Sequence, residues 1–183
     1  MKKMDLPHIL SQFIDSNYAT DLSDRKSVSS DIILLGAVAV SWKVNKDMSI
    51  ASSTTDAETR AAFKGIKRLI SIRNFIAHLG FPINYPTPVF EDNKGTFDVI
   101  QAGRTTPGTK HIDVPLCYLH EKHKSGEFEI KECSTHLMLA DGLNKALTST
   151  TIASHSAIYT GRRFLPHPST DHYRELSRLC PLS

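Results

Sequence analysis

The longest apolar stretch of the sequence runs from Ile32 to Val40, and its length limits what the chain can fold into. A transmembrane helix needs roughly 20 consecutive apolar residues, which this stretch does not approach. The wider segment 31–42 is apolar and partly β-branched. This composition over a short length predicts a buried β-strand.

Two neighbouring segments extend the strand prediction. Residues 8–14 predict a strand that runs into Asp15, and Met48–Ser53 predict a third short strand after a turn over Lys43–Asp47. Because these strands follow one another with short connections, we expect an antiparallel meander at the start of the domain.

The main helix is predicted over residues 55–79, where apolar residues recur at spacings of three and four. Gly80 follows as a stop signal. Further along, the sequence predicts a strand at Pro88–Glu91, helices at 93–102 and 113–124, a strand at Phe128–Ser134 and a last helix from Leu137 to about Leu147. This order predicts a mixed α/β domain with a central sheet.

We expect the domain to cover residues 1–150 and residues 151–183 to form a C-terminal tail with a short helix at Tyr173–Leu179. The chain is 40% hydrophobic, which is enough for a buried core, and its net charge of +3 permits nucleic-acid binding without arguing for it. Its three cysteines are too few and too uneven for a disulfide framework. No signal peptide is apparent, so we expect a cytoplasmic or nuclear protein that is not secreted and does not bind membranes.

Four acidic residues stand at the ends of predicted elements. Asp15 ends the first strand, Glu58 lies one turn into the main helix, Asp92 ends the fourth strand, and Asp141 lies in the first turns of the last helix. Sites in α/β sheets form near strand ends and adjoining helix starts, so these acids could converge. Carboxylates are the natural protein ligands of Mg²⁺, and two such metals can stabilise both oxygens of a phosphodiester under hydrolysis.

Each acid also has a purely structural interpretation. Glu58 stands three residues after Thr55, as in a capping box. Asp92 or Asn93 could cap the following helix, and Asp141 could interact with a helix dipole. Asp15 could be an exposed residue at a strand end. Spacing alone therefore leaves both interpretations open.

The segments around the acids resemble, in order, the motifs of the ribonuclease H domain of copia-type retrotransposon polyproteins. The family patterns include "L-S-S-T-E-A-E-Y", "C-D-N", "T-K-H-I-D" and "Q-L-A-D-I-F-T-K-P-L". The matching segments are Phe13-Ile14-Asp15, Ser23-Asp24-Arg25-Lys26-Ser27-Val28-Ser29, Ser52-Ser53-Thr54-Thr55-Asp56-Ala57-Glu58, Glu91-Asp92-Asn93, Thr109-Lys110-His111-Ile112-Asp113 and Leu139-Ala140-Asp141-Gly142-Leu143-Asn144-Lys145-Ala146-Leu147.

The resemblance implies a ribonuclease H-like fold, with a five-stranded mixed sheet whose first three strands are antiparallel and which is flanked by helices. It implies metal-dependent endonucleolytic cleavage of the RNA strand of RNA–DNA hybrids, with Asp15, Glu58, Asp92 and Asp141 as catalytic ligands of two Mg²⁺ ions that Mn²⁺ can replace. The implied partners are the hybrid and a reverse transcriptase of the same element.

Several positions depart from the family pattern. The tyrosine after the catalytic glutamate is replaced by Thr59-Arg60, and Pro115, Leu116 and Cys117 stand where the family commonly carries Arg, Tyr and His. Integrase and polymerase segments are also absent from the sequence. The alternative function is therefore a catalytically weak or inactive retroelement remnant that keeps the fold and at most binds nucleic acid.

Two further sets of residues are candidates for binding. Phosphate contacts to the hybrid would come from groups near the acids, and the candidates are Asn93, Lys94, Arg104, Thr105, Thr106 and Lys110. Solvent-exposed loop charges are an equal alternative for Arg104 and Lys110. A structural zinc site is a separate hypothesis, resting on the spaced pairs Cys117/His120 and Cys133/His136.

Overall fold

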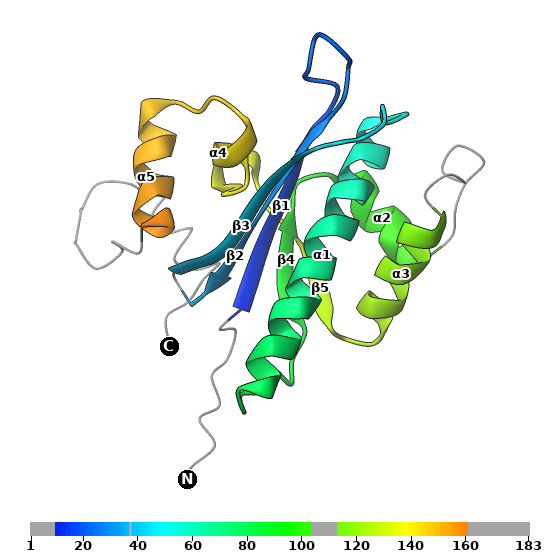
Figure 1. The fold of residues 1–183 in the computed structure, drawn as a ribbon, viewed down its shortest axis with the longest axis vertical. Coiled ribbons are helices and arrows are strands. Elements are labelled where there is room, and N and C mark those ends of the chain that lie inside the picture. Colours follow the sequence, from blue (N-terminus) through cyan, green and yellow to red (C-terminus); the bar gives the residue numbers. More distant parts are fainter. Residues whose placement is uncertain (1–9, 37, 104–112, 161–183) are drawn as a thin grey trace.

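The computed structural model describes residues 10–36, 38–103 and 113–160. Its elements follow in the order β1 (Leu10–Asn17), β2 (Val28–Leu35), β3 (Val38–Lys46), α1 (Thr54–His78), β4 (Thr87–Glu91), α2 (Lys94–Ala102), α3 (Asp113–Lys124), β5 (Phe128–Glu132), the 3-10 turn η2 (Thr135–Leu137), α4 (Asp141–Asn144) and α5 (Ser149–Tyr159). Figure 1 shows these elements arranged around one central sheet.

The sheet has five strands in the order β3-β2-β1-β4-β5. β1, β2 and β3 pair in antiparallel fashion, whereas β4 pairs parallel with both β1 and β5. The predicted mixed sheet with three antiparallel strands first is therefore confirmed.

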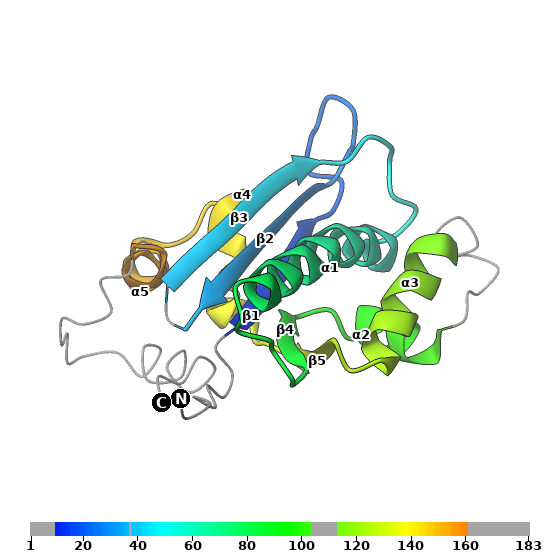
Figure 2. The same ribbon diagram turned by 60° about the horizontal axis from the view of Figure 1, so that its bottom comes forward.

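Helices cover both faces of the sheet (Figures 1 and 2). On one face, α1, α2 and α3 bury a cluster around Ile14, Ile33 and Ile66. On the other face, the segment from η2 to α5 covers a second cluster around Phe13 and Phe90. Within the described residues, no helix is both long and apolar enough to cross a membrane.

Helix α1 matches its prediction to within one residue at each end. The side chain of Ser53 caps the helix by accepting a hydrogen bond from the backbone N–H of Asp56. Gly65 lies inside the helix, where glycine is unfavourable relative to alanine. It stands where α1 packs closely on β1, because a Cβ at this position would come within 2.8 Å of Ile14 Cδ1. The glycine therefore permits the close contact between helix and sheet.

The first sequence prediction that the structure corrects concerns the apolar segment 31–42. It forms parts of two strands, β2 and β3, which are separated by a turn at Gly36, where φ is +60°. The predicted turn at Lys43–Asp47 lies largely within β3, and Met48–Ser53 is not a strand. β3 lies at the edge of the sheet, and 62% of Trp42 is exposed. Apolar residues in this strand therefore do not indicate that it is buried.

The second correction concerns the predicted helix from Leu137 to Leu147. Only η2 and the short α4 are helical there. All four residues from 137 to 140 are buried, and Met138 has an extended backbone conformation. A regular surface helix cannot bury four consecutive side chains, since they point around its whole circumference. The segment therefore crosses the core irregularly before Asp141.

Helix α5 runs across residue 150, the predicted end of the domain, and its Ile158 is buried in the second cluster. Ordered packing thus extends to the end of α5. The predicted short helix at Tyr173–Leu179 lies outside the described residues, and the division into domain and tail stays a prediction.

Packing of α1 on the sheet should dominate stability. Leu69 is fully buried in the first cluster, whereas 85% of Leu22 is exposed. We expect Leu69→Ala to lower the free energy of unfolding by about 2–5 kcal/mol. The matched substitution Leu22→Ala should change it by less than about 0.5 kcal/mol. Urea denaturation followed by circular dichroism measures both, and equal effects would contradict this assignment of the core.

Candidate metal centre

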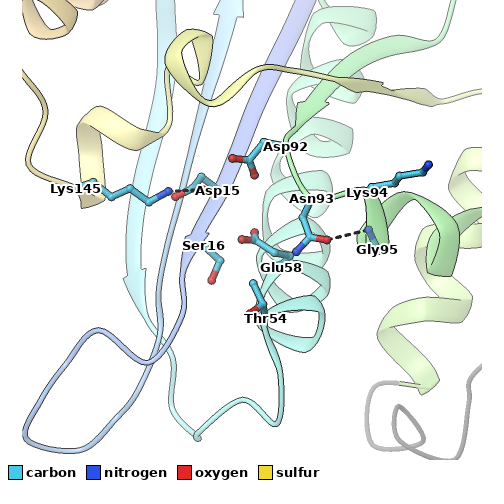
Figure 3. A pocket seen from close by; sticks show the side chains of 9 residues that line it. All are labelled: Asp15, Ser16, Thr54, Glu58, Asp92, Asn93, Lys94, Gly95 and Lys145. Atoms are coloured by element: carbon cyan, nitrogen blue, oxygen red, sulfur yellow. Dashed lines mark hydrogen bonds and ion pairs between the residues drawn. The ribbon is translucent and has the colours of Figure 1, made fainter.

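Three of the predicted acids converge at one end of the sheet. Asp15 lies in β1, Glu58 in the first turns of α1, and Asp92 directly after β4. Each offers a carboxylate oxygen, and these oxygens all lie within 4.8 Å of one another. Figure 3 shows the three side chains pointing toward one another.

The parallel pairing of β1 with β4 explains why Asp15 and Asp92 meet. Phe13 is opposite Phe90 in the register, and each acid follows two residues later. Residues two apart in a strand point to the same face of the sheet. The register therefore places the two carboxylates side by side.

Glu58 is positioned by a buried anchor at the start of α1. The carboxylate of Asp56, which is fully buried, accepts hydrogen bonds from the backbone N–H and the hydroxyl of Ser52 and from the guanidinium of Arg60. Arg60 follows Thr59 in the segment where the family motif has a tyrosine. The capping-box interpretation of Glu58 is wrong, because Ser53 caps the helix through Asp56.

Asp141 lies beside Asp15 and is joined to it by a lysine. Lys145 Nζ is 2.9 Å from Asp15 Oδ1 and 3.0 Å from Asp141 Oδ1. Asn144 Nδ2 donates a hydrogen bond of 2.8 Å to the other oxygen of Asp15. Through this shared lysine, Asp141 is linked to Asp15 and so to the group that Asp15 forms with Glu58 and Asp92.

The backbone before Asp141 is held from two sides. The Ser30 hydroxyl donates to the carbonyl of Ala140 at 2.9 Å, and the Tyr159 hydroxyl donates to the carbonyl of Leu139 at 2.5 Å. Burial and the charge of Asp141 raise the pKa of Tyr159, so it stays a hydrogen-bond donor. β2 and α5 thus fix the position of the Asp141 segment.

Burial and the charge of neighbouring carboxylates make two of the four acids, Glu58 and Asp141, hard to ionise. Burial, together with the charges of Glu91, Asp15 and Asp92, raises the pKa of Glu58 to about 11. Burial and the charge of Asp15 raise the pKa of Asp141 to about 6. Glu58 Oε2 is buried and has no hydrogen-bond partner within the described part of the chain. The site therefore favours added positive charge.

Sequence reasoning missed Glu91, Asn144 and Lys145. Glu91 is 2% exposed, and burial raises its pKa well above the usual range. In the sequence, its position directly before Asp92 was the only indication that Glu91 belongs to the site. Asn144 and Lys145 lie within a matched motif, but their contacts with Asp15 depend on how α4 packs on β1.

Asp15, Glu58 and Asp92 line an open cleft of about 490 Å³. Its lining residues are Asp15, Ser16, Thr54, Glu58, Asp92, Asn93, Lys94, Gly95 and Lys145. The predicted substrate-binding residues Asn93 and Lys94 are thus at the cleft, and Asn93 also caps α2 by accepting from the N–H of Gly95. The predicted contacts Arg104, Thr105, Thr106 and Lys110 lie outside the described residues.

The zinc hypothesis finds no matching geometry in the part of the chain that the structure describes. There, Asp15, Glu58 and Asp92 are the only group of three or more acids, histidines or cysteines close enough to share a metal ion. Cys117 is exposed on α3, whereas Cys133 is buried in the second cluster. The two Cys/His pairs therefore form no such group.

Solved structures identify the fold. A ribonuclease H1 isolated from compost, LC11-RNase H1, matches with a TM-score of 0.55 and 12% identity over 74% of this chain and 92% of that one. The same enzyme in complex with an RNA/DNA hybrid matches with a TM-score of 0.52, at 12% identity over 73% of this chain and 92% of that one. The chain has the ribonuclease H fold. At this identity, the likeness concerns the fold alone.

Curated sequences confirm the resemblance to retrotransposon polyproteins. The chain is 28% identical to the retrovirus-related Pol polyprotein from transposon RE2 of Arabidopsis thaliana over 139 residues. These residues are 76% of the chain. It is 29% identical over 139 residues, again 76% of the chain, to the corresponding polyprotein from transposon TNT 1-94 of Nicotiana tabacum. The chain spans 10% of the length of each relative. No family model matches it.

The raised pKa of Glu58 predicts how stability depends on pH without metal. The folded protein keeps a proton on Glu58 at pH values above 4.5, where the unfolded chain loses it, so the free energy of unfolding should fall as the pH rises from 4.5 to 8. We expect Glu58→Gln to reduce this fall and to stabilise the metal-free protein at pH 8 by about 1 kcal/mol or more, roughly one pKa unit.

Thermal and urea unfolding in EDTA across this pH range measures the effect. The matched control is Glu132→Gln, because Glu132 is exposed at the end of β5. It should leave the pH profile unchanged. A Glu58→Gln profile that parallels the wild-type profile would contradict the raised pKa of Glu58 in the folded protein.

Proposed function

We propose that this chain is a retrotransposon-derived, metal-dependent endonuclease that hydrolyses the RNA strand of RNA–DNA hybrids. The observation that carries the proposal is the convergence of oxygens from Asp15, Glu58 and Asp92 within 4.8 Å, with Asp141 beside them. The fold and the Pol polyprotein relatives support the same function.

The donor set fits magnesium. All the donors are carboxylate oxygens, which this hard cation prefers. Among the described residues, Glu58 Oε2 has no hydrogen-bond partner. Burial, and after it the neighbouring carboxylates, raises the pKa values of Glu58 and Asp141, and a bound cation would favour the charged form of both groups. We propose that Asp15, Glu58, Asp92 and Asp141 hold two Mg²⁺ ions, or Mn²⁺ in their place.

In the proposed reaction, bound metals and the protein have different roles. Bound metals supply Lewis acidity for the attack of water on the phosphodiester and for departure of the 3′ oxygen. The protein fixes the carboxylates through the strand register and the Asp56 anchor, so they need little reorganisation on binding. The cleft is open to solvent, and Asn93 and Lys94 line it together with three of the acids, so we assign these two residues to contacts with backbone phosphates.

The nature of the ligand follows from the same features. Proteins bind nucleic acid chiefly through the phosphate backbone of the nucleic acid. They recognise an RNA-containing duplex through its shape and its 2′-hydroxyl groups. The solved complex of LC11-RNase H1 with RNA/DNA hybrid supports this choice of substrate. The sequence relatives are retrovirus-related Pol polyproteins from plant transposons. We further propose a copia-type element as the source of the chain, the reverse transcriptase of that element as a partner, and a retroelement particle in the cytoplasm, or the nucleus, as the location.

Cleavage of a labelled RNA–DNA hybrid with Mg²⁺ or Mn²⁺ tests the proposal. We expect wild-type cleavage to require metal and Asp92→Asn to reduce the rate by about 100-fold or more, since it removes one charged donor from the site. The matched control is Asp98→Asn, on the exposed side of α2, which should cleave like wild type.

The outcomes separate the alternatives. Binding of hybrid by the wild-type protein without cleavage at any metal concentration would favour the inactive remnant. Equal cleavage by wild type and Asp92→Asn would refute the assignment of the site.

A further inference from the structure

The acidic site contains its own cation. Lys145 extends from the end of α4 with its amine between Asp15 and Asp141, within 3.0 Å of an oxygen of each. The two carboxylate side chains are 1% and 4% exposed, whereas the lysine side chain is 29% exposed. Figure 3 shows the lysine side chain extending toward Asp15, one of these two buried acids.

Both oxygens of Asp15 are engaged by the same short segment. Oδ1 accepts from Lys145, and Oδ2 accepts from the amide of Asn144, which also donates to the backbone carbonyl of Val28. Asp15 is the carboxylate common to the three-acid group and to the Asp15–Asp141 pair. A ligand that binds Asp15 must therefore displace the contacts that Asn144 or Lys145 makes with its oxygens.

The lysine stays charged in this position. A lysine amine is ordinarily protonated at neutral pH, and carboxylate oxygens of Asp15 and Asp141 lie 2.9 and 3.0 Å from it. A single positive charge close to both carboxylates offsets part of their repulsion. The same charge repels a divalent cation that approaches them.

We propose that Lys145 is a built-in counterion that competes with a divalent metal for Asp15 and Asp141, so that metal binding requires its amine to leave. This inference rests on the proposed function, because it concerns the same metal site. Lys145 is a positioning residue here: it holds the two acids together without metal and sets how strongly cations bind.

The geometry permits the exchange. Lys145 follows the four-residue helix α4 and has an extended backbone, with φ of −129° and ψ of 150°. It also lines the open cleft, so its amine can move toward solvent by rotation of its long side chain. The backbone of Asp141 remains held by Ser30 and Tyr159 through the two preceding carbonyls.

Isothermal titration calorimetry with Mg²⁺ and with Mn²⁺ tests the competition. The proteins are wild type, Lys145→Met, Lys145→Arg and the control Lys122→Met. Lys122 lies on α3, outside the cleft, and forms an ion pair with Glu127. We expect Lys145→Met to bind metal on the order of tenfold more tightly, because it removes a positive charge at the site. Lys145→Arg and Lys122→Met should bind like wild type.

Thermal unfolding separates competition from a purely structural role. In EDTA, Lys145→Met should melt below wild type, because Asp15 and Asp141 then repel each other without a counterion. Saturating Mg²⁺ should remove this deficit. A deficit that persists in Mg²⁺, or metal affinity in Lys145→Met equal to or weaker than in wild type, would overturn the inference.

Asp92→Asn distinguishes failure of this inference from failure of the proposed site. If wild type binds metal and Asp92→Asn does not, the site stands, and the affinity of Lys145→Met alone decides the role of the lysine. If Asp92→Asn binds as wild type does, the proposed metal site is wrong. If no variant binds either metal, both proposals fail.

Discussion

The parallel pairing of β1 with β4 is the constraint on which the site depends. The register places Phe13 opposite Phe90, and their rings stack with centroids 4.6 Å apart in the second core cluster. A slip of one residue would turn one of the strands over, moving its acid to the opposite face. Burial of the two aromatic rings therefore fixes where Asp15 and Asp92 meet.

The helices complete this arrangement from opposite faces of the sheet. Close contact of α1 with β1 at Gly65 and the buried Asp56 anchor bring Glu58 to the two strand acids. From the other face, the irregular segment before α4 delivers Asp141 and Lys145. The position of each acid thus depends on a different packing contact, although all of the acids meet at one site.

The concentration of negative charge works against stability. Glu58, Glu91 and Asp141 all have raised pKa values, for which burial is the largest cause. Such perturbed carboxylates in a cleft are typical of functional sites, where a ligand or metal relieves the repulsion. The Lys145 ammonium offsets part of this charge, which links the stability of the metal-free protein to the proposed metal chemistry.

Local patterns in the sequence were sufficient for α1, for the strand before Asp92 and for the order of the acids, since helical spacing and ordered motifs act over short distances. They failed where tertiary context overrode them: the apolar segment 31–42 hid a hairpin with an exposed edge strand, and the buried residues 137–140 resembled a helix. The sequence by itself determined which carboxylates are present and near which element ends they lie, although Asp15 lies inside β1, which continues to Asn17. Only the tertiary structure decided that Glu91 is buried beside them and that Lys145 bridges Asp15 and Asp141, because contacts between residues 130 positions apart depend on how sheet and helices pack.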